Sequence, residues 1–253
     1  MTRIMNIFVA TMLAVLLAWT AQAEEVFKDD FEGEVLGEDW DVINPDTESY
    51  IVEGGALLIV YAQESSIDSD ELQNLFRLTT ALPKGDWQAT IRLQPEFQTM
   101  REVMYFGLFQ DRQNYMMANA YVASWCCHAR NLSISGTKNA KGKKAHFAAA
   151  LTPEINHGAG AFDAYRDTFR KLGDGILLRL AKTGRQYVFS GRIEGSDANG
   201  KPLPWIPLQK LTSLRQKGDL VFGFTQGASG GGHVGGGGES IVNVDWVQIE
   251  TLE

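Results

Sequence analysis

The sequence predicts an all-β protein, an antiparallel sandwich of two sheets, and three observations support this fold class. Residues 87–94 alternate apolar and polar side chains with a period of two, which is typical of a strand with one buried face. Residues 103–110 are apolar on both faces, as in a strand near the middle of a sheet. The polar segment 111–114 has the length of a hairpin connection to the next apolar run, 115–121. Together these segments predict a meander.

Length and composition are those of an ordinary globular protein. The 253 residues are 44% hydrophobic and 21% charged, which is enough for a sizeable core and shows no bias toward disorder. With 23 basic and 31 acidic side chains, the formal net charge is -8. An acidic chain whose densest basic run is 138–144 offers little to a phosphate backbone, so we expect no nucleic-acid partner and interpret that run as a solvated loop.

The first 23 residues have the order of a cleavable secretory signal. Arg3 precedes an apolar run from Ile7 to Trp19, and residues 21–23 have the small-x-small pattern of a cleavage site. A membrane anchor is the alternative, but the run is shorter than the roughly 20 residues that span a bilayer. We therefore expect an exported protein, periplasmic or extracellular, with no membrane span and with one domain over residues 24–253.

Short strands separated by turn residues are predicted on both sides of the meander. The other predicted strands and hairpins cover residues 26–31, 40–43, 50–61, 75–79, 176–193, 205–208, 219–225 and 241–250. Gly54 and Gly55 supply the positive φ that a two-residue loop needs. Residues 67–73 and the glycine-rich 227–238 are predicted loops, and the second is not followed by the Gly-Lys-Ser/Thr of a phosphate-binding loop.

Residues 123–172 are the least strand-like part of the chain, and we predict that they form an insertion laid over the sandwich. Strand-like pieces occur at 124–128, 132–135 and 146–151. Apolar residues at helical spacing, followed by glycine, predict one short amphipathic helix over Ala161–Leu172. Insertions of this length often carry function, because binding residues are commonly placed on loops over a rigid scaffold.

The two cysteines, Cys126 and Cys127, are adjacent and leave three alternatives. A vicinal disulfide would be strained, because Cα atoms about 3.8 Å apart lie below the usual range of roughly 4.4 to 6.8 Å. The pair is otherwise buried and reduced, or it binds a soft metal together with His128, which requires three consecutive side chains to reach one ion.

Five motifs of Trp, Gly and Asp at strand edges occur in a characteristic order. They are Phe27–Phe31 with Trp40 following, Tyr50–Ile59, Phe106–Tyr115, Asp219–Phe224 and Val244–Ile249. In this order the chain resembles the concanavalin A-like (lectin/glucanase, laminin-G-like) jelly-roll sandwiches, and especially the C-terminal module of family 43 glycoside hydrolases. The resemblance skips 123–172. It implies a structural calcium ion near the first and last strands, with Asp30 and Asp245 at the matching positions; alternatively, both acids simply end their strands in water.

The resemblance also implies recognition of a poly- or oligosaccharide on a concave sheet. Sugar faces are bound by exposed aromatic rings, and sugar hydroxyls by amides and guanidiniums. The candidate ligand-binding residues of these types are Gln88, Arg92, Tyr115, Tyr121, Trp125 and Arg179. Three other tryptophans, Trp40, Trp87 and Trp246, fit the core pattern and are left out of the site.

Catalysis is the alternative function, as a glycoside hydrolase or a polysaccharide lyase. Glucanases of this fold place carboxylates on alternate residues of one strand, so that all of them point into one cleft. This sequence lacks that pattern, and its nearest approach, 67–71, lies in a predicted loop. The arginines, tyrosines and histidine that a lyase would use are scattered, so no catalytic residue is assigned. A laminin-G-like protein-interaction module is the third alternative.

Overall fold

The computed structural model describes residues 23–60, 66–97, 102–125, 128–152, 175–214, 218–226 and 240–252. This part of the chain consists of strands and turns, with no helix in it. Consequently it contains no helix long and apolar enough to span a membrane. Several predicted features lie outside the described residues: nearly all of the predicted signal, the cysteine pair, the predicted helix Ala161–Leu172 and the whole glycine-rich loop 227–238.

Nine strands of the described part form one antiparallel sheet. Their bounds are β1 Glu25–Asp29, β3 Tyr50–Glu53, β4 Ala56–Val60, β6 Trp87–Glu96, β11 Gly175–Thr183, β12 Gln186–Glu194, β13 Ile206–Pro207, β14 Leu211–Thr212 and β16 Ile241–Thr251. The order is β13-β12-β11-β6-β16-β4-β3, with β1 also paired to β16 and β14 to β12. In this arrangement the C-terminal strand lies inside the sheet rather than at its edge.

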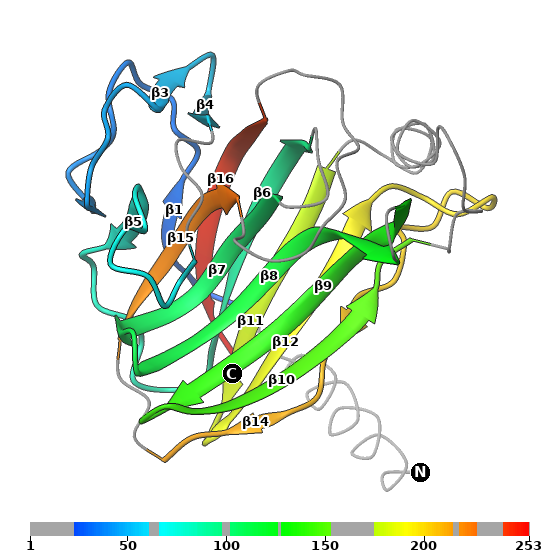
Figure 1. Ribbon diagram of the computed structural model, residues 1–253. Helices are drawn as coiled ribbons and strands as arrows, with labels where there is room; N and C mark the ends of the chain where they lie inside the picture. Colours follow the sequence, from blue (N-terminus) through cyan, green and yellow to red (C-terminus); the bar gives the residue numbers. More distant parts are fainter. Residues whose placement is uncertain are drawn as a thin grey trace, which may run out of the picture.

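The second sheet has seven strands, also antiparallel, in the described part. They are β2 Trp40–Ile43, β5 Leu75–Leu78, β7 Glu102–Asp111, β8 Asn114–Trp125, β9 His128–Ala140, β10 Lys143–Ala150 and β15 Asp219–Gln226. The order is β10-β9-β8-β7-β15-β5-β2. Figure 1 shows β7 to β10 in front of β6, β11 and β12, as two layers. The predicted all-β two-sheet antiparallel sandwich is therefore confirmed.

The predicted three-stranded meander is wrong, because its first strand belongs to the other layer. β7 pairs with β8, but β6 pairs with β11 and β16. The alternating side chains Ala89, Ile91 and Leu93 of β6 are fully buried in the core between the sheets. They share this core with Met104, Phe106 and Leu108 of β7. Burying the apolar faces of β6 and β7 against each other, in two layers, stabilises the fold more than pairing these two strands side by side in one sheet.

The first part of the segment expected as an insertion is regular sheet. β9 pairs with β8 along its length and with β10 through a tight turn. The buried Leu132 and Ile134 of β9 face the core, while the intervening Ser133 and Ser135 face away from it. The sequence signal is weak here because small and polar residues occupy the outward positions, so the alternation contains few large apolar side chains.

A β-bulge interrupts β16 between Val244 and Trp246. Val244 and Val247 are both fully buried, so the alternation changes phase between them. Trp246 is half-buried and lies outside the core cluster, whereas the predicted core residues Trp40 and Trp87 lie within it. A bulge adds one residue to its strand and redirects the side chains next to it. The bulge therefore places Asp245 and Trp246 on the outer face of the nine-stranded sheet.

Candidate functional site

The outer face of the nine-stranded sheet presents planar polar side chains from neighbouring strands. Since Ala89, Ile91 and Leu93 face the core, alternation points Gln88 and Arg92 of β6 outward. On β11, Leu178 and Leu180 face the core, so Arg179 points outward as well. Three of the six predicted ligand-binding residues, Gln88, Arg92 and Arg179, therefore share one surface.

Strand register brings a third arginine into the same surface. Leu177 of β11 lies opposite Arg92 on one side and opposite Arg192 of β12 on the other. Arg179 lies opposite Ser190, two residues along β12 from Arg192, and its Nε donates to the Ser190 hydroxyl at 3.3 Å. The three guanidiniums thus come from three adjacent strands.

Arg92 forms ion pairs with two carboxylates. Its Nε lies 2.5 Å from an oxygen of Glu194, and its Nη1 contacts Asp245. The side chains of Arg92 and Asp245 are each only 19% exposed, while that of Glu194 is 40% exposed. Asp245 reaches Arg92 because the bulge in β16 turns it toward β6. This partly buried trio joins β16, β6 and β12 and fixes the surface around it.

Trp205 packs on the other two arginines. The Cζ atoms of Arg179 and Arg192 lie 4.1 and 4.9 Å from the centre of its ring. The ring is half-buried, and it comes from the segment that leads into the edge strand β13. Guanidiniums attract the π face of an indole and also hold it in place. The result is a fixed, half-exposed aromatic surface beside two cations.

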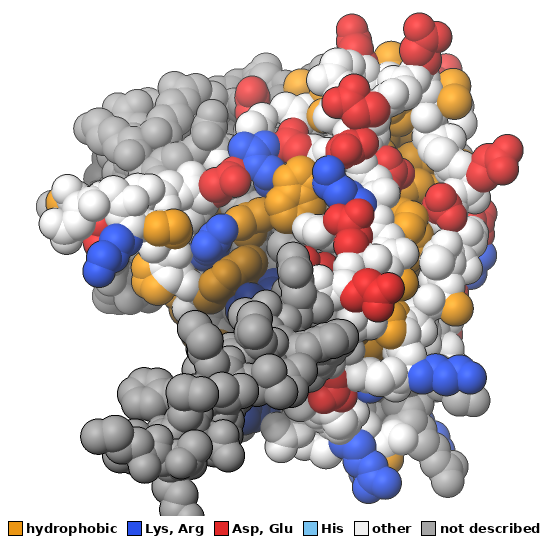
Figure 2. Space-filling model, turned by 180° about the vertical axis from the view of Figure 1, so that it is seen from behind, with side chains coloured by type: hydrophobic (Ala, Val, Ile, Leu, Met, Phe, Trp, Pro, Cys, Tyr) orange, Lys and Arg blue, Asp and Glu red, His pale blue; other side chains and the backbone are white. Residues whose placement is uncertain are grey.

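The polar groups around Trp205 are unevenly satisfied. Burial, and then the nearby charge of Arg192, lower the pKa of Arg179, while Glu250 acts in the opposite direction. The Nε of Arg192 is buried without a hydrogen-bond partner in the described part of the protein. A cavity of about 280 Å³ adjoins it, lined by Arg192, Glu194, Gly195, Ser196 and Pro202. Figure 2 shows this side of the molecule, with hydrophobic side chains bordered by basic and acidic ones.

The remaining three predicted residues, Tyr115, Tyr121 and Trp125, are on β8 of the other sheet. The structure therefore does not bring all six together. Tyr115 is 1% exposed, and its hydroxyl donates to Asp68 at 2.9 Å, so its ring offers no face to a ligand. Tyr121 is half-buried, and burial raises its pKa. The side chain of Trp125 lies outside the described residues.

The predicted calcium ligands already have cationic partners. Asp30 lies 3.1 Å from the ammonium of Lys28, and Asp245 contacts Arg92. Within the described ranges no group of three or more His, Cys, Asp or Glu side chains is arranged to hold a metal ion. These two carboxylates do not by themselves form the oxygen cluster that Ca²⁺ requires, and calcium here stays a prediction.

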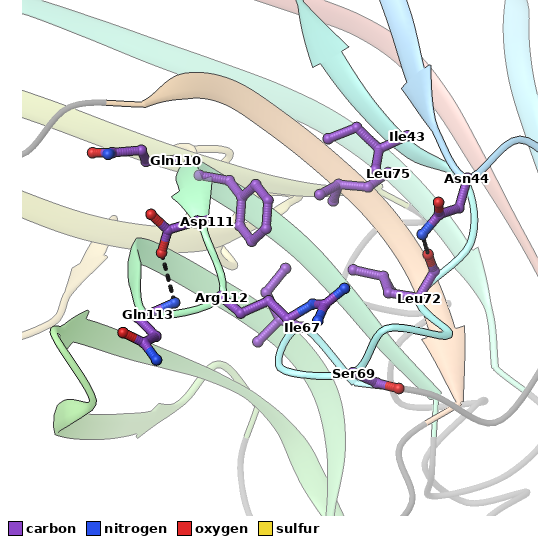
Figure 3. A pocket seen from close by; sticks show the side chains of 11 residues that line it. Ile43, Asn44, Ile67, Ser69, Leu72, Leu75, Gln110, Asp111, Arg112 and Gln113 are labelled. Atoms are coloured by element: carbon purple, nitrogen blue, oxygen red, sulfur yellow. Dashed lines mark hydrogen bonds between the residues drawn. The ribbon is translucent and has the colours of Figure 1, made fainter.

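A larger cavity of about 490 Å³ lies at the other sheet, beside the turn between β7 and β8. Its apolar lining consists of Ile43, Ile67, Leu72, Leu75 and Phe109, and its polar lining of Asn44, Ser69 and Gln110–Gln113. Figure 3 shows Arg112 extending from the turn toward Leu72, and Arg112 pairs with Asp70 there. Asn44 donates to the carbonyl of Leu72 at 2.9 Å. These contacts tie segment 66–74, which contains the predicted loop 67–73 and has no strand in it, across the outer face of the seven-stranded sheet.

Tyr105 lies under this loop and makes the folding stability of the protein depend on pH in the alkaline range. Burial, and to a smaller extent the charge of Asp68, raise the pKa of Tyr105 to about 12. A hydrogen bond with the backbone of Ile67 acts in the opposite direction and lowers it. Above pH 10 the unfolded chain loses the phenolic proton that the folded protein keeps, so the stabilisation present below pH 10 is lost as pH rises toward 12. We expect about 1.4 kcal/mol of lost stability per pH unit from this group.

Urea unfolding at pH 9, 10, 11 and 12 measures this loss. Tyr105→Phe has no proton to lose and should give a shallower decline over the same range. Equal slopes for the two proteins would contradict the assignment to Tyr105.

The sequence signal for this site was incomplete. Arg192 could be found, because it alternates with buried residues on β12 just as Arg179 does on β11. Trp205 gave no such signal, since it stands in a proline-rich segment before a strand of two residues. Its contact with Arg179 and Arg192 depends on how β13 and β11 pair with the two edges of β12, and no local sequence pattern predicts that pairing.

Comparison with known proteins identifies the fold. The sequence matches no protein-family model and, to a significant level, no curated protein. Among solved structures, the GH43 protein BlXynB from Bacillus licheniformis superposes with a TM-score of 0.61 at 13% identity, over 89% of this chain and 39% of that one. The β-glucanase of Bacillus licheniformis superposes with a TM-score of 0.55 at 10% identity, over 91% of this chain and 99% of that one. The fold is the concanavalin A-like sandwich.

The concanavalin A-like sandwich predicted from the strand-edge motifs is therefore confirmed. The CBM2 module of the evolved Dit of Lactobacillus casei BL23 phage J-1 also matches, with a TM-score of 0.54 at 14% identity, over 92% of this chain and 98% of that one. At these identities the likeness is one of fold. This chain spans less than half of the GH43 protein that it matches.

Proposed function

We propose that the protein binds a poly- or oligosaccharide on the outer face of the nine-stranded sheet, around Trp205. The observation that carries this proposal is the half-exposed indole held against Arg179 and Arg192. An aromatic ring packs against the C–H face of a pyranose, and neighbouring amides and guanidiniums bind its hydroxyls. Gln88, whose amide donates to Glu250 at 2.7 Å, extends the same surface with groups of this kind.

The structural neighbours support a carbohydrate ligand by analogy. Their names include a GH43 protein, a CBM2 module and a β-glucanase. Fold analogy alone is a weak argument for function, so the proposal depends on the Trp205 surface. We further propose that the protein acts outside the cytoplasm, as its signal-like first residues predict.

A retention assay tests the binding. Residues 24–253 are passed over immobilised β-glucan, xylan, pectin and cellulose, with calcium or with chelator, and the supernatants are analysed for released sugars. We expect retention on at least one polysaccharide without released sugar. New reducing ends or unsaturated products would instead make the protein an enzyme, and no retention on any polysaccharide would contradict the proposal. Loss of retention with chelator would support the calcium site.

Trp205→Ala should raise the Kd for the retained polysaccharide about tenfold or more, because buried aromatic anchors dominate such interfaces. Affinity electrophoresis measures the change. Val35→Ala is the matched control, since it removes an apolar side chain that is 79% exposed and distant in sequence from the surface. Equal affinity of both variants, with unchanged circular dichroism, would remove Trp205 from the site.

A further inference from the structure

The two arginines under Trp205 differ from Arg92 in their electrostatic state. Arg92 contacts both Glu194 and Asp245. Arg179 and Arg192 form no ion pair with any carboxylate of the described residues, although both are at least half-buried. Arg179 is influenced by the charge of Glu250, which opposes the lowering of its pKa, but no carboxylate of the described residues pairs directly with either guanidinium. Two adjacent, partly buried like charges are costly, so the pair is only partly compensated by negative charge.

The geometry at Arg192 indicates where an anion would sit. Its Nε is buried and lacks a partner within the described part, and the cavity of about 280 Å³ opens beside it. Glu194 also lines this cavity and pairs at 2.5 Å with Arg92, a cation that it shares with Asp245. Ser196 and the backbone at Gly195 complete the lining with groups that hydrogen-bond to hydroxyls. The cavity thus combines the Arg192 guanidinium with the ion-paired Glu194 and with neutral polar groups.

We propose that Arg179 and Arg192 select saccharides that carry a carboxylate, that is, uronic acid residues. This inference rests on the proposed function and specifies its ligand. A guanidinium binds a carboxylate through two parallel hydrogen bonds, which a neutral hydroxymethyl group in the same place does not accept. The uronate carboxylate lies against the two guanidiniums, and the sugar ring contacts the exposed part of Trp205. The overall charge of -8 repels polyanions, so binding depends on this local pair.

The test compares ligands that differ in the carboxylate alone. Glucuronoxylan and polygalacturonate are each paired with their carboxyl-reduced forms, and Kd values are measured by isothermal titration with the chain 24–253. We expect at least tenfold tighter binding to the acidic form of one pair. We also expect that preference to fall several-fold when sodium chloride is raised from 50 to 500 mM, because ion pairing is screened.

Variants assign the preference to the arginines. Arg192→Gln and Arg179→Gln should each reduce affinity for the acidic form about tenfold and leave affinity for the neutral form nearly unchanged. Arg192→Lys keeps the positive charge but loses the bidentate guanidinium. Its affinity for the acidic form should therefore lie between those of the unchanged protein and of Arg192→Gln. Lys210→Gln, which removes one positive charge at an exposed position, is the control and should change neither value.

The outcomes separate this inference from the proposed function. Equal binding of acidic and reduced forms would overturn the selection of uronates but leave saccharide binding in place. An acidic preference that survives Arg192→Gln and Arg179→Gln in folded protein would overturn the assignment to these residues. No binding of either form of any polysaccharide would overturn both.

Discussion

Replacing Arg92 by methionine is expected to lower the free energy of unfolding by about 2 to 3 kcal/mol. The change leaves the carboxylate of Asp245, whose side chain is 19% exposed, without its cation. Breaking a fully buried pair costs roughly 3 to 5 kcal/mol, and partial exposure reduces this value. Urea unfolding followed by tryptophan fluorescence measures the difference. Adding Asp245→Asn to Arg92→Met should recover about half of the loss, because the unpaired charge is then removed.

The control for this prediction is an exposed ion pair of the other sheet. Arg77 of β5 contacts Asp41 of β2, with side chains 39% and 48% exposed. Arg77→Met should cost less than about 1 kcal/mol, as is usual for surface pairs. A similar cost for Arg92→Met and Arg77→Met would show that the trio around Arg92 adds no more stability than a surface pair.

Gly107→Ala is expected to destabilise the protein by about 3 kcal/mol or more. A Cβ at this position of β7 would lie 2.1 Å from the carbonyl oxygen of Met116 and 2.9 Å from the Cα of Met117. Both are backbone atoms of the neighbouring strand β8, so no rotamer change relieves the contact and the two strands must separate. Thermal unfolding by circular dichroism measures the loss.

Gly85→Ala serves as the comparison for Gly107→Ala. A Cβ at Gly85 meets nothing within 4 Å, so its effect on stability should stay within about 0.5 kcal/mol. Comparable melting temperatures for the two variants would mean that β7 and β8 tolerate a wider spacing than the structure shows.

Strands were predictable from the sequence because their signal is local. The period of two over 87–94 and 176–193 corresponds to β6, β11 and β12. Their partners were not predictable, because β6 pairs with strands about 90 and 155 residues further along, and packing across the whole core decides this pairing. For this reason six residues predicted for one concave surface divide between two sheets.

The candidate site shows the same division between local and distant information. Arg92 and Arg179 were predicted because polar residues alternating with buried ones must face outward. Trp246 was assigned to the core because it continues the alternation of Val242 and Val244, and the bulge after Val244 reverses that assignment. The sequence shows only the trace of the bulge, a shift of the apolar positions from Val242 and Val244 to Val247 and Ile249, and Trp246 hides the point of the shift because it is itself apolar.

The interior position of β16 determines when the protein can fold. One edge of this strand pairs with β6, and the other pairs with β4 through Ile241–Val244 and with β1 through Val247–Glu250. Until β16 has been synthesised, β4 and β6 have no common neighbour and β1 has no partner. The β3–β4 pair and the group of β6, β11 and β12 can form without β16, but β16 is needed to join them into one nine-stranded sheet. That joining depends on long-range contacts, which are generally slow to form.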